Sequence, residues 1–106
     1  MFGADTAHSI TAEEVATQLE TGEKIQIIDV RQPSEYRQGH IPGARLVPLS
    51  ELNAQWSKLK RDETYVMVCR SGARSQQATQ FLLSKGFSNV KNMRGGMLAW
   101  RGPVQK

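Results

Sequence analysis

One residue in this 106-residue chain is placed where a reactive thiol would be expected. Cys69 directly follows an apolar run at residues 64–68, and the polar segment 70–75 after it leads into a predicted helix. Parallel sheets bind ligands outside the carboxyl ends of their strands. A short loop followed by a helix start turns backbone N–H groups and the positive end of the helix toward the sulfur. Because Arg70 and Arg74 add positive charge, we interpret Cys69 as a thiolate nucleophile rather than an inert buried cysteine.

Three reactions could use a thiolate in a basic loop. A cysteine protease needs a histidine base held by a third group, and we interpret the two histidines, His8 and His40, as surface or structural residues. A cysteine phosphatase uses a longer loop and an acid that protonates the leaving alkoxide. A sulfurtransferase needs neither, because its thiolate attacks a sulfane sulfur whose leaving group is already a good anion. Loop amides then hold the terminal sulfur of a persulfide until a second nucleophile removes it.

The charged residues are unequally distributed along the chain, whose net charge is +4. Residues 1–63 hold all ten acidic residues and seven basic ones, so this segment carries a charge of −3. Residues 64–106 hold seven basic residues and no acid, and this +7 segment contains Cys69. A cationic half around one thiol favours an anionic ligand or substrate, and the alternative is a basic surface that keeps the protein soluble.

Length and composition bound the other possibilities. We expect one domain over residues 1–106, since 39% hydrophobic residues suit a globular chain of this length. A single cysteine excludes an internal disulfide, a C-x-x-C redox pair and a Cys-rich zinc site. It also favours a reducing compartment, so we expect a cytoplasmic protein. We expect no membrane span, because apolar runs are short, and no signal peptide, because residues 1–5 lack a basic region and an apolar core.

The elements predicted from the pattern alternate between helix and strand. Thr11 and Glu14 form a predicted capping box for a helix that Gly22 would end. Buried strands are expected at 25–30 and 64–68, and shorter strands at 45–48 and 88–92. A second helix is expected after Ser50 as its cap, and a third should run through Ala78 to Lys85. Residues 97–100 should form one or two helical turns. The segment 31–43 is predicted to be loop with at most one helical turn. This alternation predicts an α/β fold with a parallel sheet covered on both faces.

Four stretches together resemble the rhodanese family. Each alone is a weak signal, but they occur in the family's order and spacing from residue 25 to residue 100. The stretches are residues 69–75 (CRSGARS), 29–36 (DVRQPSEY), 39–44 (GHIPGA) and 95–100 (GGMLAW). The resemblance implies a five-stranded, mostly parallel sheet with helices on both faces. It also implies transfer of a sulfane sulfur from an anionic donor such as thiosulfate to cyanide or a thiol acceptor, through a persulfide and without metal or organic cofactor.

The resemblance assigns roles residue by residue. Cys69 matches the persulfide-forming nucleophile, and the family's phosphatase relatives have one residue more in the loop than the six from Cys69 to Arg74. The predicted substrate-binding loop consists of Arg70, Ser71, Gly72, Ala73, Arg74 and Ser75. Positions expected to form internal hydrogen bonds and ion pairs are Asp29, Arg31, Glu35 and His40, while Gly95 and Gly96 match a turn near the site and Trp100 a core residue. Four arginines that could line a cationic mouth are Arg31, Arg70, Arg74 and Arg94.

Two other functions stay open. A phosphatase or arsenate reductase could use the same scaffold, although loop length argues against the first and the lack of a second cysteine argues against an internal redox cycle. A rhodanese-like binding or regulatory module would use the surface without turnover. We expect no nucleic-acid partner, because the basic half lacks interleaved aromatic residues and any RNA-binding signature. With one thiol, a persulfide on Cys69 must be handed to an outside acceptor.

Overall fold

A five-stranded sheet forms the centre of the molecule in the computed structural model, which describes residues 6–106. The strands are β1 (Ser9–Thr11), β2 (Gln26–Asp29), β3 (Arg45–Leu46), β4 (Tyr65–Val68) and β5 (Val90–Arg94). Their order across the sheet is β1-β5-β4-β2-β3, and every pairing is parallel. The predicted α/β class is therefore confirmed, and β4, which leads into Cys69, is the middle strand.

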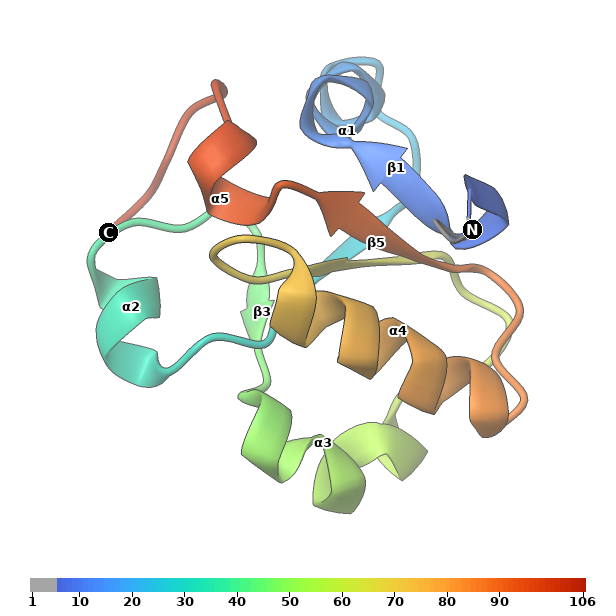
Figure 1. The fold of residues 1–106 in the computed structure, drawn as a ribbon. Coiled ribbons are helices and arrows are strands. Elements are labelled where there is room, and N and C mark those ends of the chain that lie inside the picture. The colour runs from blue at the N-terminus through green and yellow to red at the C-terminus, as the bar shows by residue number, and fades with distance from the viewer. Residues whose placement is uncertain (1–5) are drawn as a thin grey trace.

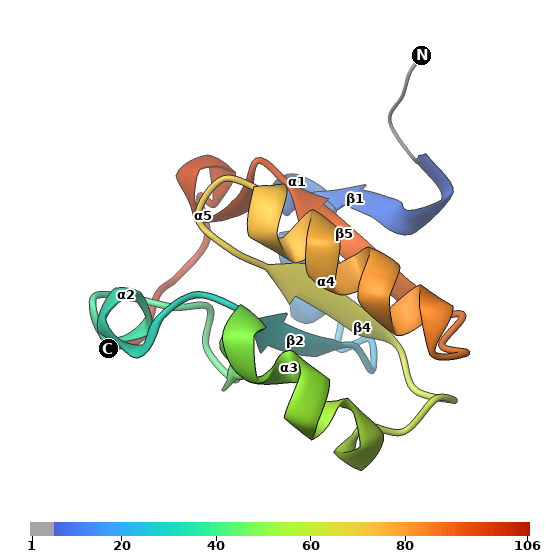
Figure 2. The ribbon, with the colours of Figure 1, turned by 60° about the horizontal axis from the view of Figure 1, so that its bottom comes forward.

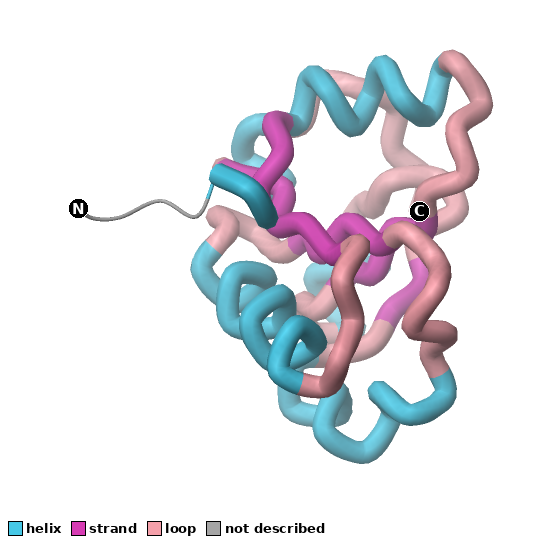
Figure 3. The backbone as a smooth tube through the Cα atoms, turned by 90° about the vertical axis from the view of Figure 1, so that its right-hand side faces the viewer, coloured by secondary structure: helices cyan, strands magenta, loops and turns pink. Residues whose placement is uncertain are grey.

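Helices cover both faces of this sheet. They are α1 (Ala12–Glu20), α2 (Pro33–Arg37), α3 (Leu49–Gln55), α4 (Ala73–Ser84) and α5 (Gly96–Ala99), with short 3-10 helices at Thr6–His8 and Trp56–Lys58. Figure 1 shows α1 on one side of the sheet and α3 and α4 on the other. Figure 3 shows the strands running between these helical layers. None of the helices within residues 6–106 combines the length and the apolar character that crossing a membrane requires.

Two apolar clusters, one on each face, hold the layers together. Ile28 and Met67 belong to the cluster beneath α3 and α4, which includes Leu52 and Leu82. Their chain neighbours Ile27 and Val66 belong to the second cluster, with Val15 of α1 and Trp100. Successive side chains of a strand point to opposite faces. The central strand β4 therefore reads as an unbroken apolar run, because both of its faces are buried.

The termini of α1 and α3 show where local signals did and did not determine the structure. The Thr11 hydroxyl accepts a hydrogen bond from the N–H of Glu14, and Oε1 of Glu14 accepts one from the N–H of Thr11 at 2.9 Å, so the predicted capping box is confirmed. The prediction that Ser50 caps the next helix is wrong. That helix begins at Leu49 with Pro48 as its N-cap, in a non-helical conformation (φ −51°, ψ 145°), so Ser50 already lies within the first turn.

Strand β1 and the position of β5 also differ from the prediction. The last strand was expected at residues 88–92 and lies at Val90–Arg94. The pattern did not predict β1, which has only three residues and pairs with β5 through Ile10 and Met93. So short a strand shows no periodicity of its own, and its hydrogen bonds depend on where β5 lies.

Candidate active site

Cys69 lies at the carboxyl end of β4, where a short loop turns into α4. Figure 2 shows this loop beside α5, beyond the ends of β4 and β5. Gly72 is the N-cap of α4 with a φ of +104°, a conformation that residues with a Cβ rarely adopt. This conformation aims the Gly72 N–H at the Sγ atom of Cys69, at 3.0 Å. The loop therefore curls back around the sulfur, as the sequence predicted for a bowl of backbone amides.

The sulfur of Cys69 is held in a state that favours the thiolate. Its residue is fully buried, and the Ser75 hydroxyl lies 3.2 Å from Sγ. Burial raises the pKa of Cys69, but hydrogen bonds from the Ser75 hydroxyl and from the backbone N–H groups of Ser75, Gly72 and Ser71 outweigh it, so the pKa lies below its usual value. Hydrogen bonds are the largest causes of this lowering, and Arg74 also interacts with the charge of the Cys69 thiolate.

The short helix α5 holds the outside of the loop in place. The N–H of Met97 donates to the carbonyl of Cys69 at 2.9 Å, and the N–H of Leu98 donates to the carbonyl of Arg70 at 3.0 Å. This approach requires Gly96, because a Cβ there would overlap the Cys69 carbonyl oxygen and lie 2.5 Å from that of Arg70. The Gly95-Gly96 pair, predicted only as a turn near the site, is thus part of the framework that shapes the loop.

Asn92 on β5 is a site residue that the sequence did not reveal. Its side chain is buried, its Nδ2 donates to the Gly72 carbonyl at 3.2 Å, and its Oδ1 accepts from the Ser75 hydroxyl at 2.5 Å. It therefore links β5 to both residues that contact the sulfur. The only available signal was a polar residue inside a predicted strand, and nothing in the pattern shows that it faces the loop from Cys69.

The four arginines expected at the mouth of the site do not act together. Arg31 is buried and forms an ion pair with Asp29 at 2.8 Å, so it is not a free charge at the surface. Arg74 binds both carboxylate oxygens of Glu35, at 2.7 and 2.9 Å. These two charges are consequently offset. Arg70 and Arg94 are exposed, and no ion pair to either is found within residues 6–106.

Comparison with known protein families identifies this arrangement. The model of the Rhodanese-like domain family matches residues 11–103. The chain belongs to the rhodanese-like family. This rhodanese-like chain is 38% identical over 93 residues to a sulfurtransferase of Allochromatium vinosum, covering 88% of the chain and 87% of that protein. It is 35% identical over 78 residues to the thiosulfate sulfurtransferase GlpE of Pseudoalteromonas translucida, covering 74% of each.

A solved structure shows that the rhodanese-like fold agrees in detail. The structure of a rhodanese-related protein from Thermoplasma volcanium superposes with a TM-score of 0.85 at 33% identity, covering 92% of this chain and 97% of that one. The five-stranded sheet and its flanking helices are therefore those of a rhodanese-like domain, as the four sequence stretches implied.

Neither histidine of the rhodanese-like domain lies against the sulfur. His40 is buried, its Nδ1 lies 2.8 Å from the Tyr36 carbonyl, and its ring stacks on that of Tyr36 with centroids 3.6 Å apart. The Nδ1 of His8 lies 3.3 Å from the Val90 carbonyl. Both residues thus have structural partners, and a protease-like Cys-His pair is not present among residues 6–106.

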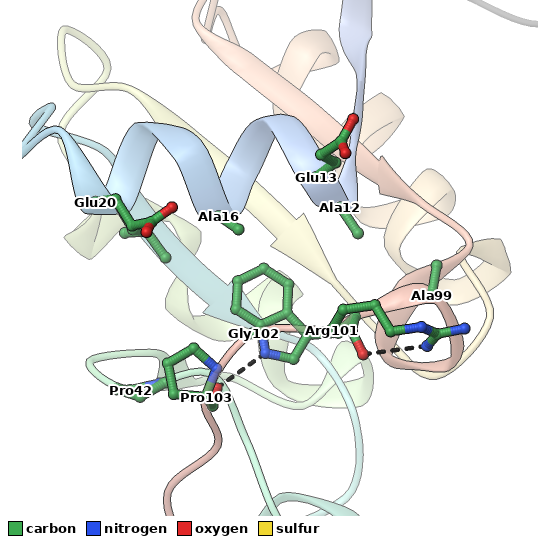
Figure 4. A pocket seen from close by; sticks show the side chains of 11 residues that line it. Ala12, Glu13, Ala16, Glu20, Pro42, Ala99, Arg101, Gly102 and Pro103 are labelled. Atoms are coloured by element: carbon green, nitrogen blue, oxygen red, sulfur yellow. Dashed lines mark hydrogen bonds between the residues drawn. The ribbon is translucent and has the colours of Figure 1, made fainter.

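A hollow of about 730 Å³ lies apart from the candidate active site. It runs between α1 and the segment that follows α5, and Figure 4 shows Ala12 and Ala16 on one side and Pro103 on the other. No residue of the loop 69–75 lines it. Within residues 6–106, no group of three or more His, Cys, Asp or Glu side chains is arranged to hold a metal ion.

The Glu35–Arg74 ion pair should make a small, pH-dependent contribution to stability. The hydrogen bonds from Arg74 hold the pKa of Glu35 at about 2, below the ordinary 4.5, despite partial burial of the carboxylate. A lowered pKa stabilises the fold above the unfolded value, and this stabilisation is lost as the pH falls from 4.5 toward 2. Because both side chains are about one-third exposed, we expect Glu35→Gln to cost only about 1 kcal/mol at pH 7.

Urea unfolding of the wild type and of Glu35→Gln across pH 2–7 would measure this contribution. The difference between the two proteins should be constant above pH 5 and shrink toward zero near pH 2. A matched control is Glu51→Gln, since Glu51 is exposed and forms no ion pair within the described residues. A Glu35→Gln difference that does not change with pH would contradict the assignment.

Proposed function

We propose that this rhodanese-like chain is a sulfurtransferase that carries sulfane sulfur as a persulfide on Cys69. The donor is a small anion of the thiosulfate type, and the acceptor is a thiol or cyanide. The observation that supports this function best is the buried Sγ atom, which receives hydrogen bonds from the Gly72 N–H and the Ser75 hydroxyl and has a lowered pKa. A lowered pKa increases the thiolate fraction near neutral pH, so this nucleophile needs no neighbouring base.

In the first half-reaction the Cys69 thiolate attacks the outer sulfur of thiosulfate. A new S–S bond forms, the S–S bond of the donor breaks, and its electron pair leaves with sulfite. The terminal sulfur of the resulting persulfide carries the negative charge. We assign its stabilisation to the backbone N–H groups of the loop made of Arg70, Ser71, Gly72, Ala73, Arg74 and Ser75, which are fixed before the reaction and need no reorganisation.

In the second half-reaction the acceptor attacks the terminal sulfur, and Cys69 leaves as a thiolate. Its lowered pKa makes it a better leaving group as well as a more abundant nucleophile. Because the chain holds one cysteine, the persulfide cannot close into an internal disulfide, and the acceptor must be another molecule. A reducing compartment such as the cytoplasm supplies thiols of this kind.

The charges near the loop support an anionic donor. Arg70 and Arg94 are exposed, whereas Arg74 is bound to Glu35, so we assign attraction of the donor to the first two and positioning of the loop to Arg74. Guanidinium groups suit oxyanions such as thiosulfate because their N–H groups match the oxygen geometry. The similarity to proteins named sulfurtransferase and thiosulfate sulfurtransferase is consistent with this assignment.

Mass spectrometry of the intact protein tests the proposal directly. Incubation with thiosulfate should add about 32 Da, the mass of one sulfur, and subsequent cyanide should remove it with release of thiocyanate. The Cys69→Ser variant is the matched control and should gain no mass. An unlabelled wild type whose thiol alkylates no faster than an ordinary cysteine would instead support a binding module without turnover. Faster hydrolysis of an aryl phosphate than sulfur transfer would support a phosphatase.

A further inference from the structure

The hydroxyl of Ser75 has a single proton and two acceptors. Its Oγ atom lies 3.2 Å from Sγ of Cys69 and 2.5 Å from Oδ1 of Asn92. All three residues are buried, so no bulk water competes for these bonds. A serine hydroxyl donates one hydrogen bond of full strength at a time. The two contacts are therefore alternatives for the one proton of Ser75.

The orientation of the Asn92 amide makes its oxygen a hydrogen-bond acceptor toward Ser75. A carbonyl oxygen only accepts hydrogen bonds, and the atom of Asn92 that faces the Gly72 carbonyl, at 3.2 Å, is therefore the Nδ2 donor. The other end of the amide, Oδ1, consequently faces Ser75 and can only accept. The Ser75 hydroxyl must be the donor whenever this contact is made, and its proton then points away from Sγ.

We propose that Asn92 is a positioning residue that holds the Ser75 proton whenever Sγ is uncharged and releases it when Sγ becomes a thiolate. This role rests on the proposed persulfide chemistry and extends it to each stage of the cycle. No covalent bond to hydrogen changes, because the hydroxyl only rotates about the Cβ–Oγ bond of Ser75. Asn92 acts on the sulfur through Ser75, and among the described residues no hydrogen bond joins Asn92 to Sγ directly.

The rotation follows the charge through the two half-reactions. In the free protein the thiolate is the stronger acceptor, and the Ser75 hydroxyl donates to it. In the persulfide the charge has moved to the terminal sulfur, Sγ is a weak acceptor, and the hydroxyl turns to Oδ1 of Asn92. As the acceptor attacks, charge returns to Sγ, and the hydroxyl turns back. The buried hydroxyl thus has an acceptor at every stage, either Sγ or Oδ1 of Asn92, which avoids the cost of an unsatisfied buried donor.

Competition between the two acceptors has a measurable consequence for the free thiol. Donation to the thiolate requires loss of the bond to Asn92, so Asn92 reduces the stabilisation that Ser75 gives the thiolate. Removing the Asn92 acceptor should then lower the pKa of Cys69, although most damage to the loop would raise it. The sign of the shift therefore separates proton sharing from simple structural support.

The charged groups around Cys69 must stay constant for this test. From α4, Arg74 faces the sulfur closely enough for the thiolate charge to act on it, and its partner Glu35 comes from α2. The other charged groups are the buried pair of Asp29, the last residue of β2, and Arg31, together with Arg70 in the loop and Arg94 at the end of β5. None of these residues is altered in the variants proposed below.

The experiment is a double-mutant cycle on the rate of Cys69 alkylation by iodoacetamide against pH. The four proteins are the wild type, Ser75→Ala, Asn92→Leu and the double variant. Ser75→Ala should raise the pKa of Cys69 by roughly half to one unit, the effect of one hydrogen bond. Asn92→Leu should lower it by about half a unit when Ser75 is present. In the Ser75→Ala background this lowering should be absent.

The cycle cancels effects that both backgrounds share, including any loosening of Gly72. If Asn92→Leu changes the pKa equally in both backgrounds, or raises it more when Ser75 is present, the proposal is wrong. The titration needs no sulfur donor. A chain that shows the coupling but takes no sulfur from thiosulfate would contradict the proposed function and leave the shared proton established.

A second measurement keeps Asn92 in place and therefore tests the proposal even if Asn92→Leu does not fold. The 13C resonance of its side-chain carbonyl should move as the pH crosses the pKa of Cys69, because Oδ1 then loses its hydrogen bond. The Ser75→Ala variant supplies the matched control, and its movement should be much smaller. Movements of equal size in the two proteins would show only the field of the thiolate and would overturn the proposal.

Discussion

Replacing Gly96 with alanine is expected to cost at least about 3 kcal/mol of unfolding free energy and to slow sulfur transfer by about 100-fold. Two physical effects add at this position. Its φ of +56° is unfavourable for a residue with a Cβ, and the new methyl group would overlap the carbonyl oxygens of Cys69 and Arg70. Both oxygens belong to backbone that cannot simply rotate away.

The loss of activity at Gly96 follows from which atoms must move. The same two carbonyls accept hydrogen bonds from the N–H groups of Met97 and Leu98. Relief of the overlap would separate α5 from the loop, break these bonds and shift the backbone that carries Cys69. A displacement of about 1 Å in catalytic atoms is enough for a 100-fold loss.

Gly22→Ala is the matched control for backbone strain. Gly22 has a φ of +77°, but nothing lies within 4 Å of a Cβ built there. The Gly22→Ala substitution should therefore lower the free energy of unfolding by only about 1 kcal/mol and leave the rate of sulfur transfer unchanged. Urea unfolding and the thiocyanate released at 15 °C would compare the two variants. Equal stabilities would show that the overlap at Gly96 is relieved without consequence.

The parts of the fold that the sequence predicts are those whose signals are local. The apolar runs at β2 and β4 reflect burial on both faces, and the Thr11–Glu14 capping box is complete within four residues. Strand β1 lacks such a signal because three residues cannot show an alternation, and its partner β5 lies more than eighty positions away. Its conformation is a consequence of tertiary contacts.

In the candidate site, too, the features that the sequence predicts are local, and those that it does not predict come from distant segments. The order of strand, cysteine, glycine and helix lies within one continuous segment, so the order of residues alone predicts where Cys69 lies. Asn92 comes from a different strand, and Glu35 reaches Arg74 across 39 positions. These contacts decide which arginines are free and how the Ser75 hydroxyl is held, and residue spacing alone does not encode them.

Breaking the buried Asp29–Arg31 ion pair should have the largest effect on stability away from the loop. Both residues are at most 6% exposed, Nε and Nη2 of Arg31 bind the two carboxylate oxygens at 2.9 and 2.8 Å, and Nη2 also donates to the Gly39 carbonyl. Asp29→Asn leaves a buried guanidinium without a counter-charge. We expect a loss of about 3–5 kcal/mol, and a melting temperature lower by more than about 10 °C.

A double variant separates the charge from the packing. Arg31→Met alone leaves a buried carboxylate and should be similarly destabilised, whereas Asp29→Asn combined with Arg31→Met removes both charges. The combined loss should be smaller than the sum of the single losses by at least about 2 kcal/mol. Strict additivity of the two single losses would mean that the charges do not interact in the folded state.

The same variants distinguish a structural pair from a catalytic one. Val30, between the two charged residues, donates its N–H to the Val68 carbonyl at 2.9 Å, so the pair lies beside β4, the strand that leads into Cys69. Within residues 6–106 no hydrogen bond joins either side chain to the sulfur. At 10 °C, where the variants remain folded, persulfide labelling should therefore proceed at nearly the wild-type rate. Slow labelling by folded protein would assign the pair a direct part in the chemistry.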